Sequence, residues 1–194
     1  MCKEYFFNGL SDWNNHIPLL WLALEETGAG DVIEMGCGDG STPQLHAYCQ
    51  EKKRTLYSFE TDEHYMKKFI ELHNKEHVFT RIINDWHVAK DRCPDPSVIL
   101  IDHAPGERRI VDVKRFADIK GILVLHDTQP PPTAADYGWE NIWHLFKYKV
   151  HLDAGKNEDP AIPDNRTWAS AVSNHHDVAK WRGLKFKNDE YVLK

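Results

Sequence analysis

The segment DVIEMGCGDGST, at positions 31–42, carries the strongest structural signal in this chain. A short apolar run ends in Glu34, glycines follow at positions 36, 38 and 40, and Ser41 and Thr42 lead into a helical pattern. This order predicts a strand, a tight turn and a helix start. Glycine suits a turn in which the backbone takes positive φ or closely approaches a ligand. We expect the turn to aim free backbone N–H groups at a ligand, near the positive end of the helix dipole.

Strand-like and helical patterns alternate along most of the chain. The run SVILI at 97–101 is apolar throughout, which is typical of a strand covered on both faces. Alternating strands and helices predict an α/β fold with a mostly parallel sheet and right-handed crossovers. Strands are expected at 31–35, 55–59, 78–83, 97–101 and 122–125, and less clearly at 148–152, 167–173 and 190–193. Helices are expected at 16–27, 43–51, 62–76, 107–118 and 139–147.

Composition and charge narrow the class of protein. A chain of 194 residues with 28% charged and 41% hydrophobic residues is ordinary for one globular domain. The net charge of −6 disfavours a nucleic-acid backbone as the main partner, because that partner selects a basic face. A local basic group at Arg108, Arg109, Lys114 and Arg115 is expected to be a solvated helix face.

The sequence also bears on location. No apolar run approaches the ~20 residues needed to cross a membrane, and the first residues lack the apolar region of a secretion signal. The four cysteines have no metal-binding spacing; they are Cys2, Cys37, Cys49 and Cys93. We expect free thiols in a reducing compartment, no membrane partner and a cytoplasmic protein.

Five predicted strands end in acidic residues: Glu34, Glu60, Asp85, Asp102 and Asp127. In open α/β sheets, ligands bind in the crevice at the carboxyl ends of the strands. Acids crowded on one edge repel one another unless a ligand or a cation offsets their charge. The acids therefore predict a binding site at this edge.

Each strand end suits a particular task. Glu60 follows Glu34 by one strand–helix–strand unit, where an acid can accept both hydroxyls of a ribose. Its alternative role is to cap the following helix. Asp85 and Trp86 would offer an acceptor to an adenine amine and a flat face to its ring, although Trp86 could equally be a packing residue.

Asp102 and Asp127 are expected at the ends of neighbouring strands. Two carboxylates with a hydroxyl or amide suit a hard cation such as Mg²⁺. His103 and His126 flank these acids and could accept a proton near neutral pH. The alternative is that each histidine bonds a neighbouring carbonyl.

The pattern Glu-x-Gly-x-Gly-x-Gly resembles motif I of the class I S-adenosylmethionine-dependent methyltransferases. A dinucleotide site would need a third glycine where Ser41 stands. The segments 98–103 and 121–128 resemble the small-molecule O-methyltransferases of the catechol methyltransferase type, and related bacterial and phage families whose fifth strand ends in His-Asp-Thr. The resemblance covers roughly residues 11–129.

The resemblance implies a single S-adenosylmethionine-binding domain over 1–194, with an N-terminal helical segment at 1–30 and a variable acceptor side at 129–194. The implied fold is Rossmann-like and doubly wound, with a mostly parallel seven-stranded sheet and helices on both faces. The implied donor site is Glu34, Gly36, Cys37, Gly38, Ser41, Glu60, Thr61, Asp85, Trp86, Asp102 and His103.

The resemblance further implies Mg²⁺ held by Asp102, Asp127 and Thr128. Thr128 stands where the catechol-type enzymes have Asn, and Pro105 stands where they have Lys. Because Pro cannot take a proton, His103 or His126, with Asp102, is expected to serve catalysis.

The expected activity is O-methylation of a small-molecule or sugar hydroxyl. Residues 129–133 and 137–139 are candidate walls of the acceptor pocket. Three alternatives remain at this point. They are a donor-binding protein without catalysis, modification of RNA or protein, and an oxygenase that uses the histidines and aspartates for iron.

Overall fold

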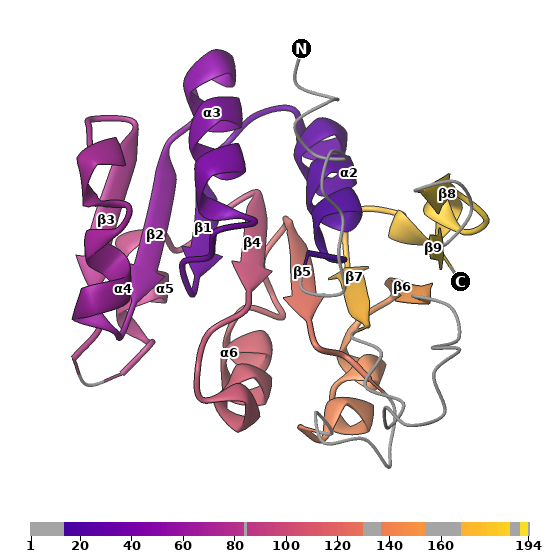
Figure 1. Cartoon of the computed structure of the whole chain (residues 1–194). Coiled ribbons are helices and arrows are strands. Elements are labelled where there is room, and N and C mark those ends of the chain that lie inside the picture. Colours follow the sequence, from indigo (N-terminus) through magenta and orange to yellow (C-terminus); the bar gives the residue numbers. More distant parts are fainter. Residues whose placement is uncertain (1–13, 84, 130–136, 154–167, 187–190, 194) are drawn as a thin grey trace, which may run out of the picture.

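A computed structural model describes residues 14–83, 85–129, 137–153, 168–186 and 191–193 of the chain. Strands and helices alternate through its first half, as the sequence predicts (Figure 1). The strands are β1 (Val32–Met35), β2 (Leu56–Glu60), β3 (His77–Arg81), β4 (Val98–Ile101), β5 (Ile122–His126), β6 (Tyr148–Asp153), β7 (Ala169–Ser173), β8 (Lys185–Phe186) and β9 (Tyr191–Leu193). The α-helices are α2 (Ile17–Thr27), α3 (Thr42–Lys52), α4 (Glu63–Lys67), α5 (Val88–Arg92) and α6 (Arg109–Arg115).

The sheet has the order β3-β2-β1-β4-β5-β7-β6-β9-β8. Strands β1 to β5 are parallel, and β7 and β6 join as antiparallel strands. This confirms the predicted Rossmann-like, mostly parallel sheet of seven strands. The short strands β9 and β8 extend it at one edge, and β8 was not predicted.

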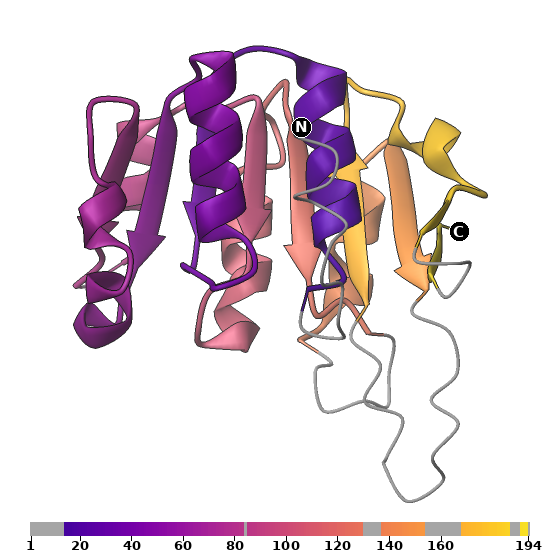
Figure 2. The same cartoon turned by 45° about the horizontal axis from the view of Figure 1, so that its top comes forward.

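Helices cover both faces of the sheet (Figure 2). Successive residues of β4 show why, since Val98 and Leu100 pack with α2 and α3, while Ile99 and Ile101 pack with α5 and α6. A strand buried on both faces exposes neither face to a ligand. Polar groups that bind ligands are therefore confined to the strand ends.

Two predicted helices are wrong in extent. The segment 62–76 forms only α4 and a 3₁₀ turn at Ile70–Leu72, because the chain reverses toward β3. Asn74 fixes that reversal by accepting from the backbone N–H groups of Glu76 and His77. The segment 139–147 forms two 3₁₀ turns, Trp139–Asn141 and Trp143–Leu145, instead of one helix. There the indole of Trp139 donates to the backbone oxygen of Asp127, which ties this segment to the end of β5.

Further 3₁₀ turns lie at Gly106–Arg108, which begins the predicted helix 107–118, and at Val178–Trp181. None of the described helices is long and apolar enough to cross a membrane. Cys37, Cys49 and Cys93 are buried free thiols, as predicted, and Cys2 lies outside the described residues.

Gly36 joins β1 to the glycine turn in a conformation that other residues rarely adopt. Its φ is +94°, and a Cβ at this position would lie 2.5 Å from the backbone oxygen of Asp102. The end of β4 therefore presses against the start of the turn, which places Asp102 beside the turn.

We predict that Gly36→Ala destabilises the protein by roughly 3 kcal/mol, because it adds backbone overlap to the cost of positive φ. Gly28→Ala is the matched control, since Gly28 also has positive φ (+64°) but nothing lies within 4 Å of its would-be Cβ. It should cost roughly 1 kcal/mol. Urea unfolding of the two variants measures the difference. Equal losses would show that the close approach to β4 is unimportant.

Candidate functional site

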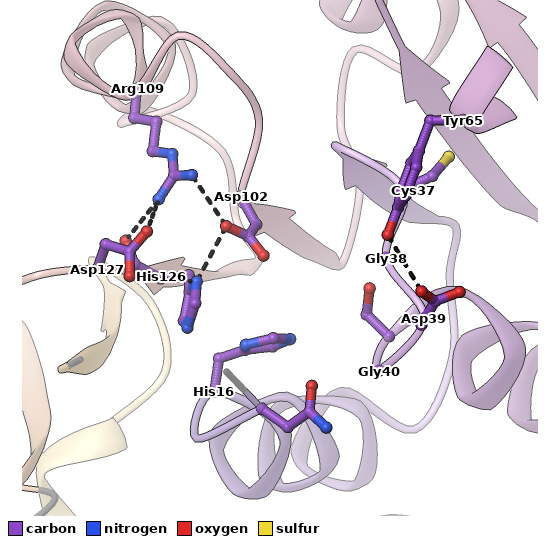
Figure 3. Close-up of a pocket in the computed structure, with 12 residues that line it drawn as sticks. His16, Cys37, Gly38, Asp39, Gly40, Tyr65, Asp102, Arg109, His126 and Asp127 are labelled. Carbon is purple, nitrogen blue, oxygen red and sulfur yellow. Dashed lines mark hydrogen bonds and ion pairs between the residues drawn. The ribbon is translucent and has the colours of Figure 1, made fainter. Parts of the chain in front are cut away.

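A pocket of about 440 Å³ opens at the carboxyl edge of the sheet, between the glycine turn and the ends of β4 and β5 (Figure 3). Its size is typical of small-molecule sites, which span about 300–1,000 Å³. The lining residues are Asn14, His16, Cys37, Gly38, Asp39, Gly40, Ser41, Tyr65, Asp102, Arg109, His126 and Asp127. The pocket lies where the sequence predicts a ligand.

The glycine turn forms one wall, but its first N–H groups are not free. The N–H of Gly36 donates to the backbone oxygen of Phe59, and that of Cys37 donates to Glu60 Oε2 at 3.0 Å. The N–H of Gly38 donates to Thr42 Oγ1 at 2.9 Å. The expectation of free N–H groups is therefore wrong for these three residues, because the protein itself supplies their acceptors.

Glu34 lies beneath the turn and does not line the pocket. Its fully buried carboxylate accepts from the hydroxyls of Ser41 at 2.6 Å, Thr42 at 2.9 Å and Ser58 at 2.6 Å. Burial raises the pKa of Glu34 to about 7, although the hydrogen bonds from the three hydroxyls act in the opposite direction. The acid therefore holds the start of α3 onto β1.

Glu60 and Thr61 also face the protein. The carboxylate of Glu60 accepts from the backbone N–H groups of Thr61 at 2.7 Å and Asp62 at 2.9 Å, besides that of Cys37. Neither Glu60 nor Thr61 is among the residues that line the pocket. Both oxygens of Glu60 therefore already accept hydrogen bonds from the protein backbone.

Asp85, Trp86 and His103 form a separate group that does not line the pocket. Asp85 pairs with Arg108 at 2.8 Å. The buried indole of Trp86 stacks on His103, with ring centroids 4.1 Å apart. His103 Nε2 lies 3.0 Å from Asp112 Oδ2, and both side chains are fully buried. The structure thus does not bring His103 to the pocket, where we expected a base, nor Trp86 to a position open to an adenine.

Arg109 joins the ends of β4 and β5. One terminal nitrogen of its buried guanidinium lies 3.0 Å from Asp102 Oδ1, and the other lies 2.8 Å from Asp127 Oδ2. Its Nε donates to the backbone oxygen of His103 at 2.8 Å. The expectation of a solvated basic face is therefore wrong for Arg109, because two carboxylates on neighbouring strand ends require a counter-charge.

The residues present do not fit the predicted Mg²⁺ set. Asp102 and Asp127 do come together, as adjacent strands require, but the Arg109 guanidinium bridges them. The hydroxyl of Thr128 lies 2.7 Å from Ser170 Oγ, and Thr128 does not line the pocket. The three predicted ligands therefore do not converge on one point.

Two histidines meet Asp102 instead. His126 Nδ1 lies 3.0 Å from Asp102 Oδ1, and the His16 ring lies edge-on to that of His126 with centroids 4.6 Å apart. Burial lowers the pKa of His16 to about 3, so its imidazole is neutral. Burial also acts to lower the pKa of His126, but the Asp102 carboxylate outweighs it and raises that pKa.

A second cavity of about 230 Å³ lies beyond β5 on the predicted acceptor side. Its lining residues are Thr128, Gln129, Trp139, Glu140, Trp143, His151 and Trp168. Trp139 and Gln129 were predicted as pocket walls, and Trp143 and Trp168 line the cavity with them. Positions 130–133 of the predicted wall lie outside the described residues.

Sequence reasoning missed His16, Asp39, Tyr65 and Arg109 as pocket residues. A role for Arg109 could have been predicted from the sequence. Pro105 stands where the catechol-type enzymes have Lys, so the basic residue nearest to the paired acids is one at the start of the next helix. No sequence signal points to His16, since it reaches the pocket only through the packing of α2 beside β5.

No known protein-family profile and no curated protein sequence matches this chain. Solved structures do match. A putative O-methyltransferase from Klebsiella pneumoniae has a TM-score of 0.57 at 12% identity, covering 89% of this chain and 86% of that one. The O-methyltransferase from Bacillus cereus in complex with SAH has a TM-score of 0.56 at 14% identity, covering 84% and 82%. A precorrin-6Y C5,15-methyltransferase from Geobacter metallireducens has a TM-score of 0.51 at 15% identity, covering 80% and 87%.

The chain has the class I methyltransferase fold. A fibrillarin and an rRNA methylase also match this class I methyltransferase fold, each with a TM-score of 0.51. Because proteins named for different acceptors share the fold, the fold does not identify the acceptor.

We predict a pH effect on stability that originates at Glu34. The folded state binds the Glu34 proton more tightly than the unfolded chain, whose glutamate pKa is 4.5, because the folded pKa is about 7. The bound proton therefore stabilises the folded state fully below pH 4.5, and this stabilisation is lost as the pH rises to about 7. Its loss should lower the free energy of unfolding by roughly 3 kcal/mol.

Glu34→Gln isolates this effect, because the amide does not titrate. The buried histidines titrate in the same range with the opposite sign, since burial lowers the pKa values of His16 and His77 to about 3 and that of His151 to about 4. We therefore compare the free energy of unfolding of wild type with that of Glu34→Gln by urea unfolding from pH 4 to 8. The wild-type value minus the variant value should fall as the pH rises. A difference independent of pH would contradict the raised pKa.

Proposed function

We propose that this protein transfers the methyl group of S-adenosylmethionine to a hydroxyl oxygen of a small molecule. The observation that carries the proposal is one pocket with the glycine turn on one side and a polar cluster from β4, β5 and α2 on the other (Figure 3). The fold and the position of the pocket at the carboxyl edge of the sheet support it.

The donor is placed along the glycine turn. Of the predicted donor residues, Cys37, Gly38 and Ser41 line the pocket on this side, and Asp102 lines it on the other. Tyr65 offers the aromatic ring here, in place of the buried Trp86, and lies next to Asp39 in Figure 3. Carboxylates on both sides of the pocket favour a sulfonium cation.

The acceptor is placed against the opposite side. Asp102 and His126, two of the three predicted catalytic residues, line the pocket there, together with His16. Their imidazole and carboxylate groups can hydrogen-bond a hydroxyl and fix its direction. An in-line approach lets the oxygen–carbon bond form as the carbon–sulfur bond breaks, and the hydroxyl proton must leave on this side.

Arg109 has a supporting role. Its permanent charge keeps Asp102 and Asp127 together as anions at the edge of the pocket. The pKa of Asp102 stays below its ordinary range, because burial, which would raise it, is outweighed by His126 and Arg109. No step is assigned to Mg²⁺, since the predicted ligand set does not converge.

Two alternatives are less well supported. The net charge of −6 disfavours RNA as the acceptor, although RNA-acting proteins are among those with this fold. A donor-binding protein without catalysis would also fit the fold, and measurement of methyl transfer separates it from an enzyme.

We predict that calorimetry will show one molecule of SAH or S-adenosylmethionine bound per chain, with a Kd below about 100 µM. Tyr65→Ala should weaken binding by about two- to tenfold, because an aromatic contact contributes about 0.5–1.5 kcal/mol. No measurable heat at millimolar ligand would overturn the proposal.

Asp85→Asn is the matched control for donor binding. Asp85 was predicted as a donor residue but lies outside the pocket, so its substitution should change Kd less than about twofold. If Asp85→Asn weakened binding and Tyr65→Ala did not, the donor would lie toward Trp86 instead.

Methyl transfer can be screened with radiolabelled donor against catechols, sugars and nucleosides. For the acceptor found, we predict that Asp102→Asn lowers kcat about 100-fold and leaves the donor Kd within about threefold. Asp118→Asn, which changes an exposed acid, is the control and should match wild type. Donor binding without transfer to any acceptor, including RNA, would indicate the non-catalytic alternative.

A further inference from the structure

Three metal-binding side chains converge in the pocket from three different elements. His16 precedes α2, Asp102 follows β4 and His126 ends β5. One ligand atom from each lies within 4.8 Å of the other two. Figure 3 shows both imidazole rings and the carboxylate facing the same hollow. This set differs from the predicted Mg²⁺ ligands, with which it shares only Asp102.

His126 and Asp102 place two ligand atoms side by side. His126 Nδ1 lies 3.0 Å from Asp102 Oδ1, so one cation can contact both groups once Nδ1 has lost its proton. Metal binding commonly displaces such a proton, because an imidazole nitrogen binds a metal through its lone pair.

His16 is more unusual, because both of its ring nitrogens are buried without a partner in the described part of the chain. Its side chain is 2% exposed. A buried polar atom without a partner costs about 1–3 kcal/mol. Two such atoms on one ring indicate that a bound species completes this site.

One oxygen of the Asp102 carboxylate is available to a cation. Asp102 shares Arg109 with Asp127, so a single guanidinium bridges two carboxylates. Arg109 and His126 both contact Oδ1 of Asp102. Within the described part of the chain, Oδ2 of Asp102 has no ion-pair partner. The carboxylate can therefore keep its bridge to Arg109 through one oxygen and offer the other to a cation.

We infer that His16, Asp102 and His126 bind a divalent transition-metal ion, such as Zn²⁺, Fe²⁺ or Co²⁺. Imidazole ligands favour these ions, whereas Mg²⁺ prefers oxygen ligands throughout. Three protein ligands in an open pocket leave a position for a further ligand. Metal binding does not depend on the proposed methyl transfer. If both hold, a cation here would lower the pKa of an acceptor hydroxyl that reaches it.

Co²⁺ is the probe of choice, because its absorption spectrum reports its ligands. The full-length protein, treated with chelator and dialysed, is titrated with Co²⁺ without donor or acceptor. We expect one equivalent with the d–d bands of a site containing nitrogen ligands, displaced by Zn²⁺ but not by millimolar Mg²⁺. Absence of such a site would overturn the inference and leave the donor-binding result unaffected.

Matched histidine variants exclude adventitious binding, since the chain has 12 histidines. His16→Gln should weaken Co²⁺ binding at least tenfold. His144→Gln, which changes an exposed histidine, should bind like wild type. Equal binding by wild type and both variants would overturn the inference.

Because His16 is buried, His16→Gln is first checked for folding by circular dichroism. If it does not fold, X-ray absorption of the Co²⁺-loaded wild type decides the matter. Two imidazole ligands on cobalt would support the site, and fewer than two would overturn it.

Discussion

The bridge from Arg109 to Asp102 and Asp127 is the interaction on which this site depends. Parallel strands that are buried on both faces present their polar groups at one edge, so acids at the ends of β4 and β5 come within bonding reach. Two neighbouring carboxylates repel each other and resist burial unless a positive charge joins them. The guanidinium supplies that charge with two separate nitrogens, one for each strand end. The same guanidinium also donates to the backbone oxygen of His126 at 3.2 Å, which ties the end of β5 to the bridge.

The placement of the strand ends was predictable from the sequence. The apolar runs around Ile33 and Ile99 identify strands that are buried on both faces, and alternation with helices requires them to be parallel. The juxtaposition of Asp102 and Asp127 follows from that topology alone. The positive φ of Gly36 agrees with the expected role of glycine in the turn, whereas its close approach to the end of β4 was not predicted.

The partners of these groups were not predictable from the sequence. An acid after a strand gives the same signal whether it binds a ligand, as expected for Glu60, or accepts backbone N–H groups, as the structure shows. Which of these occurs depends on how the turn after β1 packs against the end of β2. This packing brings together segments that are far apart in the sequence, so the sequence pattern alone does not specify it. His103 and His126 look equivalent in sequence, yet one is buried against Asp112 and the other faces the pocket.

The exchange of a metal for an arginine has a consequence for the chemistry of the pocket. A bound Mg²⁺ between two strand-end carboxylates can dissociate and can coordinate a substrate oxygen, whereas the Arg109 guanidinium is part of the chain and can only donate hydrogen bonds. Arg109 thus neutralises the acids, and other groups are left to bind a ligand. These groups are the imidazoles of His16 and His126 and the second oxygen of Asp102. Because two of these three groups are nitrogen ligands, this pocket is chemically distinct from an all-oxygen Mg²⁺ site, although the sheet that positions it is the same.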